Sequence, residues 1–429
     1  MLSMGKNINP WQLLVLSFAL LILAGNFLLY YFPSLIQGNL SEIDALFTST
    51  SAVCVTGLVT VPTSQFSLTG QLFILLLIQL GAIGIMTLTS SFLLMLKGKI
   101  SLKHKIIFSQ IQENQAFVDA SLVLKNILKI TFITELSGFI LLTIGFIWQG
   151  LSWKKAMYQG FFHSISAFCN AGFSTYDTSL EGMNPLIKIT ISLLIIMGGL
   201  GYFVIYEIIS HPGKSKKKFS LHSKIVLITT TALIGAGMLF IKLSRWEHID
   251  WIDSFFQSVT TRTAGFNSVD LNQMPISIIF LMMLLMFIGA SPGSTGGGIK
   301  TTTFFIMFYS IFSVLKGEKQ LIIFKRNIAF QNIVKAFATA TLYAGVIIAG
   351  VILLLESNDI SLRDGLFESV SAMGTVGLSL GITPLLNTFG KSVIIALMFI
   401  GRLGPASFAL ATLSKKKKTK IKYPQGEIY

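Results

Sequence analysis

Four glycines stand in four polar stretches of an otherwise apolar chain, and each follows a phenylalanine by ten residues. The stretches read FTSTSAVCVTGLV, FHSISAFCNAGFS, FQSVTTRTAGFNS and FESVSAMGTVGLS, and their glycines are Gly57, Gly172, Gly265 and Gly377. Glycine permits φ values that turn successive carbonyls to one side, and it lets backbones approach one axis without an intervening Cβ. The chemistry that suits these residues is coordination of a dehydrated cation by main-chain oxygens.

The third stretch also holds an arginine, Arg262, three residues before its glycine. The other stretches have uncharged residues there, namely Cys54, Cys169 and Gly374. A fixed positive charge in line with a cation would oppose its passage. We therefore expect Arg262 behind the loop, donating to carbonyls of neighbouring loops or pairing with an acid such as Glu368. A solvent-facing position at the outer mouth is the alternative.

The elements that must position these stretches are membrane helices. The chain has 429 residues, of which 52% are hydrophobic and 12% charged, and this composition is typical of an integral membrane protein. About 20 apolar residues cross the hydrocarbon core. Runs of that length lie at about 12–35, 71–96, 126–148, 186–209, 225–243, 275–315, 336–355 and 392–413. The predicted fold is an all-α polytopic membrane protein with eight transmembrane spans, of which 275–315 is too long for one simple helix.

The spans and polar stretches form a repeated unit of span, outward segment and span. Four repeats cover residues 1–98, 99–210, 211–318 and 319–429, the last with a basic C-terminal tail. Counting 24 and 27 residues past each glycine reaches the small-residue motifs GAIG, IMGG, GASP and GRLG. The repetition predicts a pseudo-fourfold arrangement around one axis.

Each outward segment reads as a short helix that ends near its glycine. Ser41, Asp250 and Ser361 are candidate N-caps with acidic residues in the first turn, whereas Ser152 is followed by lysines. Residues 43–53 would give a helix of about 16 Å, half the thickness of a bilayer. Irregular backbone at membrane depth is tolerated only inside protein or along a water-filled path. The segments are therefore predicted to be re-entrant pore loops.

Charge distribution predicts the orientation in the membrane. Basic runs such as KGKISLKHK, HPGKSKKK, KGEKQLIIFKR and KKKKTKIK fall on alternate connections, so these connections and both termini are expected in the cytoplasm. Twelve of the 18 acids lie in the other connections, which would concentrate cations outside. This distribution argues against nucleic acid as a partner. The two cysteines form no disulfide framework or metal-ligand pattern.

The second span of the third repeat is interrupted by the run GASPGSTGGG. A proline and five glycines cannot continue a helix. A nucleotide-binding P-loop is not expected, because Ile299 separates the last glycine from Lys300 and no strand precedes the run. We expect a flexible obstruction beneath the glycines, a gate formed by Gly289, Ala290, Ser291, Pro292, Gly293, Ser294, Thr295, Gly296, Gly297 and Gly298.

An arginine, Arg402, occupies the corresponding span of the fourth repeat, at the position matched by Ala82, Met197 and Ala290. A charge within a span is costly and by default functional. We expect Arg402 to face the cavity, bond to carbonyls of the interrupted run and hold it closed. Snorkelling of this side chain to the cytoplasmic headgroups is the alternative.

The motifs NAGFST, TTRTAGFNSVD, GTVGLSLG, SPGSTGGGIKTTT and GRLGP, in this order over nearly the whole chain, resemble the Trk/Ktr/HKT superfamily of potassium transporters, most closely its KtrB-type members. The resemblance implies a potassium-selective filter made by the four glycines and the residues before them. The implied ion-binding set is Thr56, Gly57, Asn170, Ala171, Gly172, Thr263, Ala264, Gly265, Thr375, Val376 and Gly377.

The resemblance also implies partners and a location. It implies a homodimer in the plasma membrane, on a cytoplasmic KtrA-type ring that binds the nucleotide, ATP or ADP. K⁺, with a dependence on Na⁺, would be the ion. A secondary transporter that couples a cation gradient to alternating access is the competing function. An enzyme is not expected, because the histidines and acids form no nucleophile or ligand pattern.

Overall fold

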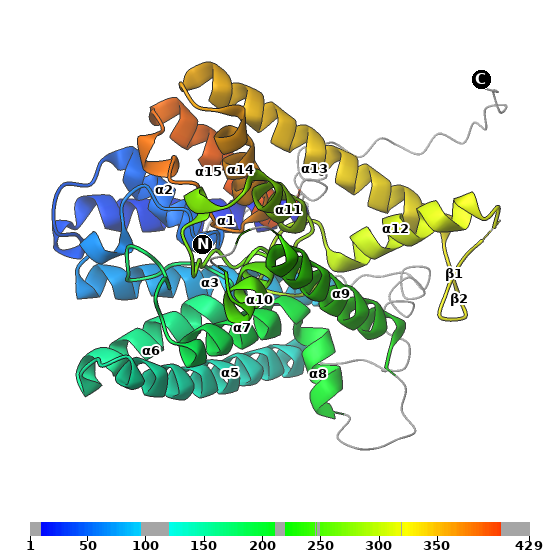
Figure 1. The fold of residues 1–429 in the computed structure, drawn as a ribbon, viewed down its shortest axis with the longest axis horizontal. Coiled ribbons are helices and arrows are strands. Elements are labelled where there is room, and N and C mark those ends of the chain that lie inside the picture. Colours follow the sequence, from blue (N-terminus) through cyan, green and yellow to red (C-terminus); the bar gives the residue numbers. More distant parts are fainter. Residues whose placement is uncertain are drawn as a thin grey trace.

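The computed structural model describes residues 10–95, 120–210, 219–244, 246, 249–318 and 320–404, and they are mostly helical (Figure 1). Within them, four helices have the length and hydropathy of a membrane span, or five if one bent pair counts as a span. The four are α1 (Pro10–Tyr31), α5 (Ala120–Trp148), α9 (Leu221–Leu243) and α13 (Phe330–Ser357). Each matches the first span of a predicted repeat, and the total of eight spans stays a prediction. The basic runs at 97–105 and 211–218 and the C-terminal tail lie outside the described residues.

Of the second helices of the repeats, the first has 28 residues, and the other three are shorter, with 12 to 16 residues. In chain order they are α3 (Leu68–Met95), α7 (Pro185–Leu200), α11 (Ile276–Phe287) and α15 (Thr388–Leu403). The run 275–315 is interrupted as expected, because α12 (Thr301–Leu315) begins only after an irregular segment. The run predicted as a span at 186–209 is sharply bent. There α7 ends at Leu200 and α8 (Tyr202–Ser210) leaves at 104°.

Four short helices precede the glycines: α2 (Glu42–Val53), α6 (Trp153–Phe168), α10 (Trp251–Thr260) and α14 (Leu362–Gly374). Three begin at the predicted caps, since Ser41, Asp250 and Ser361 accept the backbone N–H three residues on. Ser152 makes no such side-chain bond. The sequence therefore located both ends of these helices.

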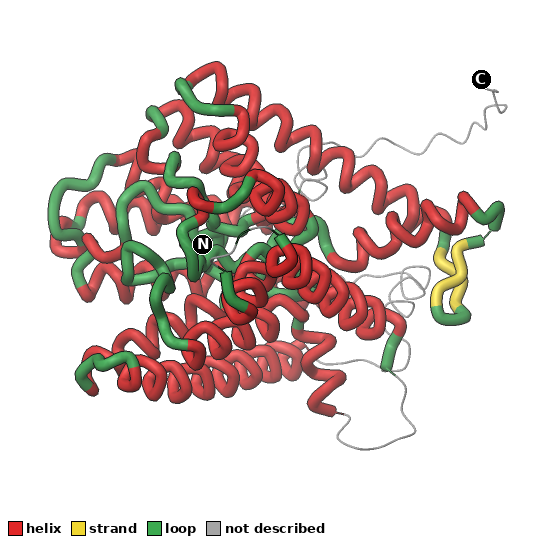
Figure 2. The backbone as a smooth tube through the Cα atoms, viewed as in Figure 1, coloured by secondary structure: helices red, strands yellow, loops and turns green. Residues whose placement is uncertain are grey.

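The short helices and second helices pack in a closed cycle. Helix α3 packs on α6, α7 on α10, α11 on α14, and α15 returns to α2. Each second helix thus supports the short helix of the next repeat. In the tube view the loops gather between the helices of these repeats (Figure 2).

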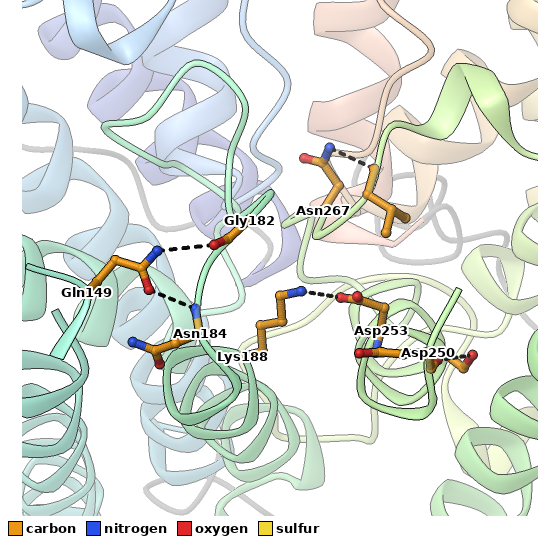
Figure 3. A network of polar contacts seen from close by, with 9 residues as sticks. Gln149, Gly182, Asn184, Lys188, Asp250, Asp253 and Asn267 are labelled. Carbon is orange, nitrogen blue, oxygen red and sulfur yellow. Dashed lines mark hydrogen bonds and ion pairs between the residues drawn. The ribbon is translucent and has the colours of Figure 1, made fainter. Parts of the chain in front are cut away.

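Two ion pairs lie at opposite junctions of this cycle. Lys188 Nζ of α7 is 2.6 Å from Asp253 Oδ1 of α10 (Figure 3), and Lys391 Nζ of α15 is 2.7 Å from Asp44 Oδ1 of α2. At the first junction, Tyr158 donates to the side chain of Gln71 instead. The two ion pairs join a second helix to the first turn of the next short helix, and the Tyr158 contact joins α3 to the second turn of α6.

The register of the third repeat differs from the predicted one. Phe47, Phe162 and Phe367, each ten residues before its glycine, are fully buried, but in the third repeat the fully buried ring is Phe256. Phe255, ten residues before its glycine, is only partly buried. The spacing from the buried phenylalanine to the glycine is therefore one residue shorter in the third repeat than in the others.

The remaining elements are small. They are the 3-10 turns η1 (Pro33–Leu35), η2 (Thr63–Gln65), η4 (Leu271–Gln273) and η5 (Thr383–Leu385), and the antiparallel hairpin of β1 (Leu321–Ile323) and β2 (Arg326–Ile328).

Candidate functional site

The four predicted glycines lie in a ring of mutually contacting loops. A Cβ added to Gly57 would lie 2.4 Å from the carbonyl oxygen of Ala171. The same relation joins Gly172 to Ala264 O at 2.6 Å, Gly265 to Val376 O at 2.4 Å, and Gly377 to Thr56 O at 2.1 Å. Each glycine therefore abuts the carbonyl of the next loop, and the fourth closes on the first. There is no room for a side chain at any of the four positions.

Backbone conformation alternates along every loop of the ring. The glycines have φ between 71° and 98°, and the residue two positions earlier also has positive φ: Val55, Asn170, Thr263 and Thr375. The intervening residues do not. Because left-handed and ordinary residues alternate, successive carbonyls can turn toward one side. The sequence analysis missed Val55, which is identifiable only by its register. Positive φ in β-branched Val55, Thr263 and Thr375 is a strained conformation of the kind found at functional sites.

Hydroxyl groups near the ends of the short helices hold the loops. Ser51 Oγ accepts from Gly57 N at 3.0 Å, and Ser371 Oγ accepts from Gly377 N at 3.1 Å. In the second and third repeats the hydroxyl donates to the carbonyl after the glycine: Ser166 to Phe173 O at 2.8 Å and Thr260 to Phe266 O at 2.6 Å. Every loop is thus tied to its own helix beside its glycine.

The interrupted run 289–298, named the gate loop below, is attached to the break between α7 and α8. Ser291 N donates to Gly199 O at 3.0 Å, and Thr295 N donates to Gly198 O at 3.2 Å. Tyr202 N donates in the other direction, to Gly293 O at 3.1 Å. Carbonyl groups at the C-terminal end of α7, which have no partner within the helix, thus accept hydrogen bonds from the gate loop.

The same loop reaches the ring. A Cβ added to Gly296 would lie 2.0 Å from Thr263 Oγ1, and one added to Gly297 would lie 2.3 Å from Thr375 Oγ1. Thr295 Oγ1 is 3.3 Å from the side-chain amide of Asn170. The gate loop therefore lies against the residues two positions before the ring glycines in three of the four loops.

Arg402 makes the contact expected of it. Its Nη1 donates to the carbonyl of Thr295 in the gate loop, and its Nη2 donates to Gly81 O at 3.2 Å. The residue is 5% exposed, so the alternative of snorkelling to the headgroups is wrong.

The predicted counterpart of Arg402 in the second repeat needs correction. Gly81, Gly198 and Gly401 each approach the carbonyl at the end of a short helix, that of Val53, Phe168 and Met373 respectively, with an added Cβ 2.0 Å from the oxygen. The position after Gly198 is Gly199, so Met197 is not the equivalent residue. The loop after Gly172 is two residues longer than counting from the glycine assumed.

A second cation, Lys300, bonds to the gate loop, and the sequence analysis missed it. Lys300 Nζ donates to Gly296 O at 2.8 Å and lies 3.4 Å from Gly297 O. Its position just after the glycine run could have indicated this role, but the sequence analysis considered Lys300 only as the possible lysine of a nucleotide-binding loop. Arg402 and Lys300 together bind the carbonyls of three consecutive loop residues.

Arg262 is buried behind the ring, 5% exposed, so the solvent-facing alternative is wrong. Its Nη2 donates to Gly289 O at 3.3 Å, a carbonyl at the start of the gate loop. The suggested pairing with Glu368 is also wrong. Glu368 accepts hydrogen bonds from the hydroxyls of Ser379 and Thr383 instead.

Two acids of the apolar segments have local partners. Glu135 accepts from Gln79 Nε2 at 2.9 Å, and Glu207 accepts from Ser220 N at 2.7 Å at the start of α9. Cys54 and Cys169 are free thiols. In the described part of the chain, no three His, Cys, Asp or Glu side chains gather as metal ligands.

Comparison with known proteins places this geometry in a family. The family model of TrkH, described as a cation transport protein, matches residues 9–422. The Ktr system potassium uptake protein B of Bacillus subtilis is 38% identical over 98% of this chain and 96% of its own length. The protein of the same name from Vibrio alginolyticus is 36% identical, over 97% of this chain and 94% of its own.

A solved structure shares the fold. The crystal structure of the potassium transporter TrkH from Vibrio parahaemolyticus aligns with a TM-score of 0.76 and 18% identity, covering 96% of this chain and 87% of the other. The resemblance to the Trk/Ktr/HKT superfamily expected from the motifs is thereby confirmed. The chain belongs to the TrkH family of cation transport proteins.

Proposed function

We propose that this protein is a gated potassium uptake pore. The observation that carries the proposal is the closed ring in which each of four glycines contacts the carbonyl of the next loop. In the pore, the carbonyls of Thr56, Ala171, Ala264 and Val376 replace the hydration shell of K⁺. No covalent chemistry is involved. The names of the curated relatives, potassium uptake proteins, support the choice of ion.

The gate loop closes the path on the inner side of the ring. It is held by three backbone hydrogen bonds to the α7–α8 region and by the side chains of Arg402 and Lys300. Flux requires the loop to move aside, and small residues permit this because they carry little packed surface. Arg262 fixes the first residue of the loop from behind the ring.

The pore is proposed to lie in the plasma membrane as four span, pore-loop, span repeats, with eight spans and both termini cytoplasmic. Support comes from the cyclic packing of α3 on α6, α7 on α10, α11 on α14 and α15 on α2. The active form is proposed to be a homodimer on a KtrA-type nucleotide-binding ring. The names of the relatives, protein B of a Ktr system, support a further component.

Rubidium uptake by the reconstituted protein tests this function. We expect uptake down a Rb⁺ gradient that excess K⁺ abolishes and equal Na⁺ inhibits only weakly. Uptake that requires an imposed Na⁺ or H⁺ gradient would instead favour a secondary transporter. Absence of Rb⁺ flux from protein that is monodisperse and correctly inserted, with and without Na⁺ present, would contradict the pore.

A further inference from the structure

Four buried polar side chains stand behind the ring, one at the same place on each short helix. Each directly follows the fully buried phenylalanine, and none is more than 1% exposed: Thr48, His163, Gln257 and Glu368. Burying polar groups is unfavourable unless they are hydrogen-bonded. Their partners therefore indicate what each one does.

His163 and Glu368, which belong to opposite repeats, make the same contact. His163 Nε2 lies 3.1 Å from Ser174 Oγ, and Ser379 Oγ donates to Glu368 Oε2 at 2.8 Å. Both serines stand two residues after a ring glycine. Each of them accepts a backbone N–H two residues further on, from Tyr176 at 3.1 Å and from Gly381 at 3.0 Å.

The direction of these hydrogen bonds is fixed. His163 Nδ1 lies 2.9 Å from the carbonyl of Gln159, which can only accept, so Nδ1 carries the proton. In a neutral imidazole Nε2 is then an acceptor, and Ser174 donates to it. The second carboxylate oxygen of Glu368 accepts from Thr383. Both side chains thus bind the segment that follows the ring glycine, here called the outer segment of the loop, to their own short helix.

The first and third repeats lack this contact. Their residues two positions after the glycine are Val59 and Asn267. Among the described residues, neither the hydroxyl of Thr48 nor either amide atom of Gln257 has a hydrogen-bond partner. Asn267 is held from the second repeat, donating through its N–H to Ser179 Oγ and through Nδ2 to Glu181 Oε1, both at 3.2 Å. Support from the short helix therefore reaches the outer side of the ring at two opposite positions.

We propose that His163 and Glu368 are positioning residues that hold the outer side of the ring open from two opposite sides and thereby set its preference for potassium over sodium. The inference rests on the proposed function, since it takes the ring to be the potassium path. When the segments after Gly172 and Gly377 are free to move inward, the carbonyls can close around the smaller Na⁺.

The test compares matched variants by Na⁺ inhibition of Rb⁺ uptake. Glu368→Met and His163→Phe remove the acceptor while keeping a side chain of similar size. We expect half-inhibition at a Na⁺ concentration roughly fivefold lower, as for the loss of one buried hydrogen bond. Ser379→Ala and Ser174→Ala remove the donor, together with the acceptor for the backbone N–H two residues further on, and should shift inhibition in the same direction. Adding Ser379→Ala to Glu368→Met should give little further change.

Thr48→Val is the control, because it changes the equivalent position in a repeat without the contact, and it should leave Na⁺ inhibition unchanged. Glu368→Gln retains an acceptor and should restore most of the preference. If the wild-type protein prefers K⁺ over Na⁺ and both serine variants keep that preference, the inference is overturned, while the proposed pore is unaffected. A shift in Thr48→Val equal to that in Glu368→Met would also overturn it, since loosened packing alone would then be sufficient. A wild-type protein without any preference would contradict the proposed function instead.

Discussion

At the residue scale, the ring glycines are required for two separate reasons. Their φ is positive, and an added Cβ would meet a backbone oxygen of the next loop. Backbone strain alone costs about 1 kcal/mol. An overlap with neighbouring backbone cannot be relieved by a side-chain rotation, so the loops themselves must separate.

Gly57→Ser should therefore lower the preference for K⁺ over Na⁺, because the new Cβ, 2.4 Å from Ala171 O, forces the first two loops apart. The measurement is competition by Na⁺ in Rb⁺ uptake. Gly150→Ser is a matched control, since Gly150 has nearly the same φ, 95° against 98°, and nothing within 4 Å of an added Cβ. It should lower stability by about 1 kcal/mol and leave ion competition unchanged. If competition by Na⁺ is unaltered in Gly57→Ser, Gly57 is not part of the filter.

Arg402→Ala should raise basal Rb⁺ flux, because it deletes a buried charged donor to the gate loop. The loss of a charge-assisted hydrogen bond of about 1.5–3 kcal/mol would shift the open population by about tenfold or more. Arg363→Ala is the comparison, since Arg363 pairs with Asp364 at the start of α14, away from the loop. Reduced flux in Arg402→Ala at normal expression would argue against a role of Arg402 in holding the gate loop closed.

At the element scale, the gate loop contacts both the break between α7 and α8 and the loops of the ring. Deleting Gly296 and Gly297 should remove the segment that lies against Thr263 and Thr375 and raise flux through the ring. Flux is measured in liposomes at equal protein content. A deletion that abolishes flux while the protein remains folded and inserted would contradict a gate at this position.

The junction between the last and first repeats should be sensitive to acid. Burial acts to raise the pKa of Asp44, but hydrogen bonds from Lys391 and Ser41 outweigh it and hold the pKa below its ordinary value of 3.8. The stability from this lowered pKa is fully present above pH 3.8 and is lost as the pH falls through the folded-state value. Asp44→Asn should thus unfold at lower temperature than wild type at pH 7, and the difference should shrink below pH 3.8. An undiminished difference in acid would contradict the ion pair as its cause.

The elements show how far the sequence could be interpreted. Capping residues and glycines located the short helices and the gate loop because these signals are local. The break at Gly201 was missed because its cause is distant: the loop carbonyl of Gly293 accepts from Tyr202, and an added Cβ at Gly201 would lie 2.6 Å from Pro292 O.

The register errors have a similar origin. A count from each glycine assumes loops of equal length. The second repeat has two extra residues before Gly198, and the third has one fewer before Gly265. Only the packing of Gly198 on Phe168 O, and the burial of Phe256 in place of Phe255, reveal the difference.

At the scale of the whole molecule, the fold is a cycle of four units in which each second helix supports the next short helix. The closure from α15 to α2 joins residues 347 positions apart, Lys391 and Asp44. Because every junction supports two loops of the ring, a disturbance at one junction is expected to reach both neighbours. The site is thus a property of the assembled cycle and not of any single repeat.

In the proposed pore, carbonyls of four loops coordinate potassium inside this ring. Anomalous diffraction from crystals of the protein grown in Rb⁺ tests this coordination most directly. We expect a Rb⁺ peak on the axis of the ring, in contact with the carbonyl oxygens of Thr56, Ala171, Ala264 and Val376. This peak should weaken when K⁺ replaces Rb⁺. Rb⁺ bound elsewhere along the chain, with no peak inside the ring, would contradict it.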